Sequence, residues 1–144
     1  MADIMSPEKR SVVMSRIRSR NTKPEMAVRS ALHRMGVRFR LHRKDLPGRP
    51  DIVLPRYRTV VFVHGCFWHQ HAGCRLASKP SSNTEYWLEK LRRNQERFTE
   101  HAAALAESGW RVAVIWECET RHREELNGII LERAGQSSPS TSTR

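Results

Sequence analysis

Residues 61–74 concentrate the side chains of this chain that could do chemistry. The segment contains three histidines, two cysteines and an adjacent Phe-Trp pair. Imidazole and thiolate groups are the usual ligands of zinc, and a histidine outside a metal site can transfer protons. Neighbouring aromatic rings have the right shape to wedge between stacked bases. The segment therefore indicates a metal site, a nucleic-acid contact and a catalytic group in one short stretch.

The cysteines have the spacing of a metal site. Cys66 and Cys74 flank a short loop that contains histidine, and Cys118 could complete a four-ligand shell from the end of a distant strand. Four protein ligands would close the site, which favours a structural zinc over a catalytic one. The alternative is that the cysteines are buried free thiols. Spacing alone leaves three candidates for the histidine ligand: His71, His69 and His64.

Asp51 is a second candidate for chemistry. It follows Pro50 where a loop enters an apolar strand, and the second strand of the same hairpin brings His64 to the same end. A carboxylate in that place could bind a divalent cation together with phosphate oxygens. The ordinary alternative is an aspartate that only forms a turn. With His64 nearby, the pattern favours metal-assisted hydrolysis of phosphodiesters.

The charge of the whole chain points to a partner rich in phosphates. The 144 residues include 26 Lys and Arg against 15 Asp and Glu, which gives a formal charge of +11. Such an excess attracts polyanions such as double-stranded DNA, and a protein that is merely basic is the plainer alternative. No segment approaches the ~20 apolar residues of a membrane span, and the N-terminus lacks the apolar run of a signal peptide. We therefore expect a cytoplasmic protein without membrane contact. One basic domain needs no partner subunit, so we also expect a monomer.

A sheet and several helices must position these groups. A capping box at Thr22–Glu25 begins a helix, so Glu25 has a structural role available before any catalytic one. Hydrophobic periodicity predicts a helix over 23–35, strands over 38–42, 52–54 and 59–63, a helix over 84–108, a buried strand over 110–116 and a helix over 123–134. The expected fold class is therefore α/β, with a central mixed β-sheet flanked by α-helices.

The two ends of the chain differ from this domain. Ser6 and Pro7 have the pattern of an N-cap and a first-turn proline, and the helix they begin carries an apolar edge that includes Met14 and Ile17. That edge either docks on the core or forms the apolar wedge of an arm that contacts DNA. The chain thus divides into a basic N-terminal helix or arm at 1–20, one domain at 21–134 and a disordered tail at 135–144.

Several motifs taken together resemble those of one protein family. They are Asn21–Glu25, Pro47–Ile52, Val61–His71, Trp87–Lys90, Asn94, Gly109–Val112 and Trp116–Cys118. These motifs resemble the very short patch repair (Vsr) DNA mismatch endonucleases, a divergent branch of the PD-(D/E)xK nuclease superfamily. The resemblance covers roughly residues 5–120. It implies a restriction-endonuclease-like fold with a structural zinc site.

The resemblance also implies an activity and a setting. The activity would be a Mg²⁺-dependent nick in double-stranded DNA, 5′ of the mismatched thymine in T:G mismatches that arise from deamination of 5-methylcytosine. The setting would be a bacterial cytoplasm, at the nucleoid while the enzyme acts. The implied partners are mismatch-repair proteins and a cytosine-5 methyltransferase system.

Individual residues take roles from the same resemblance. Asp51 matches the catalytic aspartate that holds Mg²⁺, and the backbone carbonyl of Val63 would be a further ligand. Glu25, His64 and His69 match residues around the scissile phosphate, and His64 or His69 would transfer the proton. The implied zinc ligands are Cys66, His71, Cys74 and Cys118.

Other matching residues would recognise the mismatch. Phe67, Trp68 and Trp87 match aromatic residues that insert into the base stack, and Met14 and Ile17 match residues that approach through the minor groove. A T:G wobble pair is easier to unstack than a Watson–Crick pair, so such wedges could convert that weakness into selectivity. Without the resemblance, Trp87 would be interpreted as a packed helix residue.

One position departs from the family pattern. Phe98 stands where a family member has an aspartate associated with the active-site histidine. Either Glu96 or Glu100 replaces that acid, or the histidine works unassisted, or Phe98 is simply a core residue of its helix. Two alternative functions also stay open: a Vsr-like nuclease with a different DNA substrate, and a zinc-stabilised DNA-binding module without catalytic activity.

Overall fold

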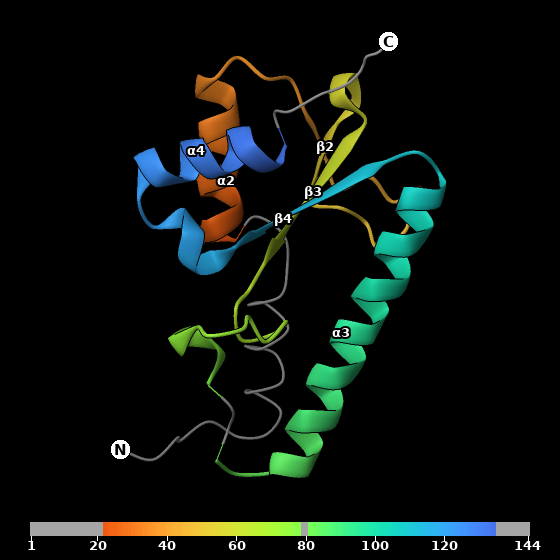
Figure 1. Ribbon diagram of the computed structural model, residues 1–144, viewed down its shortest axis with the longest axis vertical. Helices are drawn as coiled ribbons and strands as arrows, with labels where there is room; N and C mark the ends of the chain where they lie inside the picture. Colours follow the sequence, from red (N-terminus) through yellow and green to blue (C-terminus); the bar gives the residue numbers. More distant parts are fainter. Residues whose placement is uncertain (1–21, 79–80, 135–144) are drawn as a thin grey trace.

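The computed structural model describes residues 22–78 and 81–134 (Figure 1). Three predicted features lie outside these residues: the N-terminal arm at 1–20, its side chains Met14 and Ile17, and the tail at 135–144. The described part contains a mixed sheet and three α-helices, which confirms the predicted α/β class.

The sheet has four strands in the order β1-β2-β3-β4. Their bounds are β1 Arg40–Leu41, β2 Ile52–Leu54, β3 Thr59–His64 and β4 Arg111–Trp116. The first three strands are antiparallel neighbours, and a 3₁₀ turn at Pro55–Tyr57 joins β2 to β3 as the predicted hairpin. Strands β3 and β4 are parallel, with Val63 opposite Ile115. Parallel neighbours need a long crossover, and the chain between them contains the longest helix.

The helices cover both faces of the sheet. Their bounds are α2 Lys23–Arg34, α3 Thr84–Glu107 and α4 Arg123–Arg133. In Figure 1, α2 and α4 lie together on one side of the strands and α3 lies on the other. Alternate residues of β3 face the two layers, because Val61 packs in the core beneath α2 and α4 whereas Val60 and Phe62 pack beneath α3. The catalytic candidates at the end of β3 are therefore attached to a strand that is buried on both faces.

Helix α3 is longer than the surface that it covers. Leu91 and Leu105 are buried, as its hydrophobic spacing predicts, whereas Leu88 is 41% exposed. Figure 1 shows the N-terminal part of α3 running past the strands. Leu88 lines a second hollow together with Gln70 and Cys74 of the loop after β3. Leu88 therefore lies outside the two hydrophobic clusters of the core.

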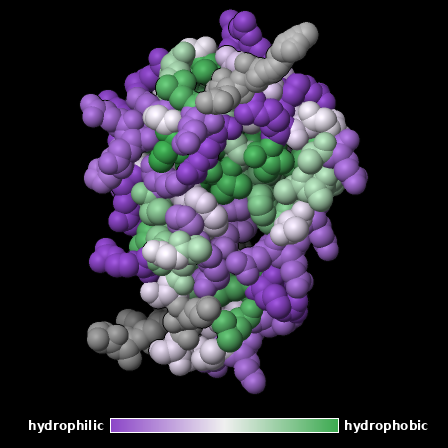
Figure 2. All heavy atoms as spheres, viewed as in Figure 1, coloured by the Kyte–Doolittle hydropathy of each residue, from purple (hydrophilic) through white to green (hydrophobic). Residues whose placement is uncertain are grey.

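The surface is predominantly polar. Figure 2 shows hydrophilic residues over most of one face, with hydrophobic residues in smaller groups between them. Tyr86 is the most exposed large hydrophobic residue of the described part, at 60%. No helix in residues 22–78 and 81–134 is both long enough and apolar enough to cross a membrane.

Gly48 lets the loop between β1 and β2 lie against α3. Its φ is +75°, and a Cβ added there would be 2.9 Å from the Cβ of His101. We expect Gly48→Ala to lower the free energy of unfolding by about 1–3 kcal/mol, because both the backbone conformation and the contact become strained. Gly128→Ala in α4 is the control: nothing lies within 4 Å of its added Cβ, so alanine should stabilise the helix. Urea unfolding of both variants checks this, and equal midpoints would contradict it.

Candidate active site and metal centre

One cleft brings together all four predicted catalytic residues. It has a volume of about 710 Å³ and lies between the ends of β2 and β3, the start of α2 and the middle of α3. The residues of interest that line it are Glu25, Arg49, Asp51, His64, Phe67, Trp68, His69, Asn94, Arg97, Phe98 and His101. Carboxylates, histidines, arginines and aromatic rings therefore share one concave surface, which is the usual form of an active site.

Asp51 lies at the entrance to β2 and reaches across the hairpin. Its Oδ2 accepts a hydrogen bond of 2.7 Å from the backbone N–H of Val63. Burial raises the pKa of Asp51 to about 7, and the hydrogen bond from Val63 opposes that rise. The negative charge of Glu25 raises the pKa further. A carboxylate in such a place gains strongly from a bound cation, because the cation stabilises the ionised form.

Glu25 and His42 complete a cluster around Asp51. Each of the three residues offers one ligand atom, and these atoms all lie within 4.8 Å of one another. His42 Nε2 is 2.7 Å from Glu25 Oε2, and Arg29 Nη1 is 3.5 Å from the same oxygen. Thr22 caps α2 by accepting a hydrogen bond from the Glu25 N–H, so the capping role and the position in the cleft coexist. This set of donors could hold a divalent cation.

The sequence did not point to His42. Pairing of β1 with β2 brings it beside Asp51, where the His42 N–H donates a 3.2 Å hydrogen bond to the Asp51 carbonyl oxygen. Strand β1 has only two residues, so hydrophobic alternation carries almost no signal for this pairing. A histidine directly after a short, basic strand looks like an ordinary surface residue.

His64 and His69 form a stacked pair. Their ring centroids are 3.6 Å apart and their planes differ by 5°. Burial lowers the pKa of His64 to about 3 and that of His69 to about 4. Both imidazoles are therefore neutral near pH 7, and a neutral imidazole can accept a proton from water. His64 is only 5% exposed, and neither of its ring nitrogens has a hydrogen-bond partner among the described residues.

Phe98 packs directly on this pair. Its ring meets His64 edge-on at 4.5 Å between centroids, and it lies 6.2 Å from His69 and 5.1 Å from Phe62. Phe98 thus belongs to the core beneath α3 and also forms one wall of the histidine site. Glu96, a possible replacement acid, forms an ion pair with Arg92 on the exposed face of α3. Glu100, the other possible replacement acid, is also exposed.

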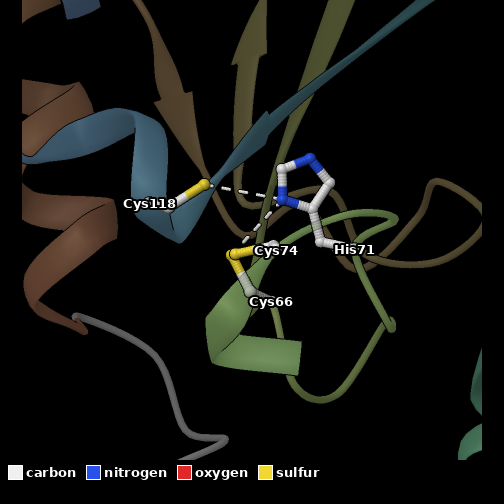
Figure 3. Close-up of side chains that lie close together, drawn as sticks. All are labelled: Cys66, His71, Cys74 and Cys118. Carbon is white, nitrogen blue, oxygen red and sulfur yellow. Dashed lines mark hydrogen bonds between the residues drawn. The ribbon is translucent and has the colours of Figure 1, made fainter. Parts of the chain in front are cut away.

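Cys66, His71, Cys74 and Cys118 form a separate cluster (Figure 3). Their ligand atoms all lie within 4.8 Å of one another, and His71 Nδ1 is 3.7 Å from Cys66 Sγ and 3.5 Å from Cys118 Sγ. Ligands at the usual zinc distances and tetrahedral angles lie about 3.5–3.8 Å apart. The donor set and the spacing therefore fit a tetrahedral metal ion, and the cluster can hold one.

Of the three candidate histidines, His71 is the one that lies in this cluster. His71 points into it, stacked on Trp116 at 4.1 Å between centroids. His64 and His69 lie in the cleft instead. Cys118 comes from the turn that follows β4, whereas Cys66 and Cys74 follow β3, so an ion bound here would tie the loop after β3 to the neighbouring strand.

The three predicted wedge residues of the described part form one aromatic group. Phe67 and Trp68 have ring centroids 5.1 Å apart, and Trp87 lies 5.7 Å and 5.9 Å from them. Phe67 and Trp68 line the cleft. Trp87 is half-buried, so it both packs against these rings and stays accessible. The wedge residues and the catalytic candidates therefore lie on the same side of the domain.

Comparison with known proteins identifies close relatives. Residues 2–75 match the family model described as DNA mismatch endonuclease Vsr. A protein named Type II nicking enzyme V.XorIIP, from Xanthomonas oryzae pv. oryzae, is 59% identical over 83% of this chain and 87% of its own length. Type II nicking enzyme V.NmeAIP of Neisseria meningitidis is 46% identical over 92% of this chain and 96% of its own length. DNA mismatch endonuclease Vsr of Escherichia coli is 46% identical over 91% of this chain and 83% of its own length.

These relatives are endonucleases, and they match almost the whole chain rather than one motif. The region that these relatives match contains the cleft, the Cys/His cluster and the mixed sheet. This chain belongs to the Vsr family of DNA mismatch endonucleases.

Proposed function

We propose that this protein is a Mg²⁺-dependent endonuclease that nicks double-stranded DNA 5′ of the mismatched thymine in T:G mismatches left by deamination of 5-methylcytosine. The observation that carries the proposal is one cleft in which Asp51 and Glu25, the histidine pair and the Phe67–Trp68 wedge all face the same space. The name of the E. coli relative, a DNA mismatch endonuclease, supports the substrate class.

Asp51 and Glu25 are the proposed ligands of Mg²⁺, and the Val63 carbonyl stays a further predicted ligand. When bound there, the cation would polarise the scissile phosphate and stabilise the charge that develops on its oxygens. The structure supports a binding role for Asp51, because the cluster around it gathers two carboxylates in a partly buried position. Arg49 and Arg97 line the same cleft and could contact the DNA backbone on either side.

His69 is the proposed proton-transfer group. It is more exposed than His64 and stacks on it, so His64 would hold the His69 ring while His69 accepts a proton from the attacking water. A new phosphorus–oxygen bond to that water would form as the existing phosphorus–oxygen bond 5′ of the thymine breaks, and the leaving oxygen would take up a proton from solvent. Phe98 would contribute by packing against both rings, without taking part in proton transfer.

Phe67, Trp68 and Trp87 are the proposed mismatch wedge. Their rings form one group beside the catalytic residues, and aromatic rings inserted between base steps unstack them. We propose zinc for the Cys/His cluster, in a closed and structural role, because thiolate and imidazole are its preferred ligands. The zinc would then hold the loop that carries Phe67, Trp68 and His69, whereas Trp87 lies on α3.

We expect Trp68→Ala to weaken nicking of T:G duplexes by about 10- to 100-fold, because each base–aromatic contact contributes about 1–3 kcal/mol. Tyr86→Ala is the matched control, since Tyr86 is an exposed aromatic residue that is neither one of the three proposed wedge residues nor part of the lining of the cleft. The readouts are the nicking rate and the fluorescence of 2-aminopurine placed beside the mismatch. We expect Trp68→Ala, but not Tyr86→Ala, to lower the nicking rate and to lose the change in 2-aminopurine fluorescence. If Trp68→Ala behaved like the wild type in both measurements, Trp68 would not be a wedge residue.

The whole proposal is tested by mapping the cut. The protein and Mg²⁺ are incubated with a duplex that carries one T:G mismatch and different end labels on its two strands. The expected product is a single nick immediately 5′ of the thymine, with the guanine strand intact. Cutting at matched positions would instead favour a family nuclease with another DNA substrate, and binding without cutting would favour a non-catalytic module.

The expected setting follows from the same proposal. A monomer in the bacterial cytoplasm, acting at the nucleoid with mismatch-repair proteins and a cytosine-5 methyltransferase system, stays a prediction. The division of the chain into an N-terminal arm that contacts DNA and a Vsr-like endonuclease domain also stays a prediction.

A further inference from the structure

His42 lies in the cluster with Glu25 and Asp51, yet it has no role in the proposed mechanism. Two contacts fix its place. Its backbone N–H donates to the Asp51 carbonyl oxygen at 3.2 Å, and its Nε2 lies 2.7 Å from Glu25 Oε2. Its backbone is in the left-handed region, with φ 49°, directly after strand β1. His42 is thus hydrogen-bonded to the backbone of Asp51 and to the carboxylate of Glu25, the two residues that are proposed to hold the cation.

The distances fit a shared ion. Two adjacent ligands of an octahedral cation, each about 2.1 Å from it, lie about 3.0 Å apart, and opposite ligands lie about 4.2 Å apart. The 2.7 Å between Glu25 and His42 is close to the adjacent separation, and all three ligand atoms lie within 4.8 Å of one another. A cation could therefore replace the proton between Glu25 and His42 with only a small opening of the cluster.

The donor set then differs from one made of oxygen alone. Carboxylates and water suit Mg²⁺, whereas an imidazole nitrogen favours first-row transition metals. Arg29, at 3.5 Å from Glu25 Oε2, adds a positive charge that opposes any cation equally, so it does not alter the preference between two divalent ions.

We propose that His42 Nε2 is a third protein ligand of the cation held by Asp51 and Glu25, and that it makes this centre bind Mn²⁺ more tightly than Mg²⁺. The inference rests on the proposed function only for the existence of a cation centre at Asp51. It adds a residue and a metal preference that the mismatch activity does not require.

The test measures Mn²⁺ binding without DNA, so that it does not depend on nicking. Zinc-loaded full-length protein is titrated with Mn²⁺, and the free ion is measured by continuous-wave electron paramagnetic resonance, with Mg²⁺ as competitor. Pulsed measurements on the bound ion detect nitrogen coupled to the metal. The variants are His42→Gln, Asp51→Asn and the control His101→Gln, a histidine that lines the same cleft outside the cluster.

The expected result has three parts. Wild-type protein and His101→Gln bind Mn²⁺ at least about tenfold more tightly than Mg²⁺ and show nitrogen coupling. His42→Gln loses the coupling, and its Mn²⁺ affinity falls about 10- to 100-fold while its Mg²⁺ affinity changes little. Asp51→Asn binds neither ion at the concentrations that saturate the wild type.

Two results would overturn the inference. They differ in whether they also contradict the proposed cation centre at Asp51. If His42→Gln binds Mn²⁺ like the wild type and the wild type shows no nitrogen coupling, His42 is only a hydrogen-bond partner of Glu25, and the proposed endonuclease stands. If the wild type binds no Mn²⁺, or if Asp51→Asn binds it unchanged, the cation centre at Asp51 is wrong as well.

Discussion

Asp51→Asn should abolish measurable nicking, with a fall in rate on the order of 10³-fold or more. The asparagine oxygen can still accept the hydrogen bond from the Val63 N–H, so the local geometry should persist. What is lost is the negative charge that would bind the cation at the scissile phosphate. Nicking of a T:G duplex under single-turnover conditions measures the effect.

The same substitution should stabilise the protein when no Mg²⁺ is present. Burial raises the pKa of Asp51 from 3.8 to about 7. Between about pH 4 and pH 7 the carboxyl group is therefore protonated in the folded state and ionised in the unfolded state. Stability of the wild type should therefore fall as pH rises from about 4 to about 7, by at most about 4 kcal/mol, and then level off. Asparagine does not ionise, so the variant should be more stable than the wild type at pH 8.

Asp45→Asn is the matched control, because Asp45 is an exposed carboxylate in the same loop that pairs with Arg43. It should nick normally, since surface ion pairs contribute little to stability. Urea unfolding across this pH range, in buffer that lacks Mg²⁺ but contains no chelator, separates loss of the fold from loss of chemistry. An active Asp51→Asn variant would show that the carboxylate has no catalytic role.

Loss of the proposed zinc should destabilise the domain and remove its activity together. A four-ligand structural zinc supplies binding free energy on the order of 10 kcal/mol, so Cys118→Ser should lower the free energy of unfolding by several kcal/mol. Burial raises the pKa of the Cys66 thiol, so this ligand needs a bound cation to ionise near pH 7. His69 and Trp68 lie in the loop that the ion would hold, so nicking should fail at the same chelator concentration that loosens this loop.

Metal analysis and zinc add-back provide the control. Metal-depleted wild type should recover both stability and nicking when zinc returns, whereas Cys118→Ser should recover neither. One zinc per folded chain is expected. Folded, active protein without zinc would contradict the assignment.

Local sequence patterns predicted the parts of this structure that depend on neighbours in the chain. The hairpin of β2 and β3 follows from two apolar runs with a short connection, and α3 follows from apolar residues at helical spacing. The spacing of Cys66 and Cys74 indicated a metal loop, and Cys118 was expected at the end of β4, where the structure has it. Spacing could not select His71, because three histidines lie within reach of the same loop.

Contacts between distant segments were harder to predict. Glu25, His42 and Asp51 meet only because β1 pairs with β2 while α2 packs beneath the sheet, and a two-residue strand gives no periodicity from which to infer that pairing. The role of Phe98 was open for the same reason: its position on α3 fitted a core stripe, and only the packed structure shows that the core there includes His64.

The most direct measurement of the central claim compares two duplexes that differ at one base. The single-turnover nicking rate of the wild-type protein with Mg²⁺ is measured on a T:G duplex and on the T:A duplex of otherwise identical sequence. Because unstacking a mismatch costs a few kcal/mol less than unstacking a proper pair, we expect the T:G duplex to be nicked at least about 100-fold faster. Equal rates on the two duplexes would contradict a mismatch endonuclease.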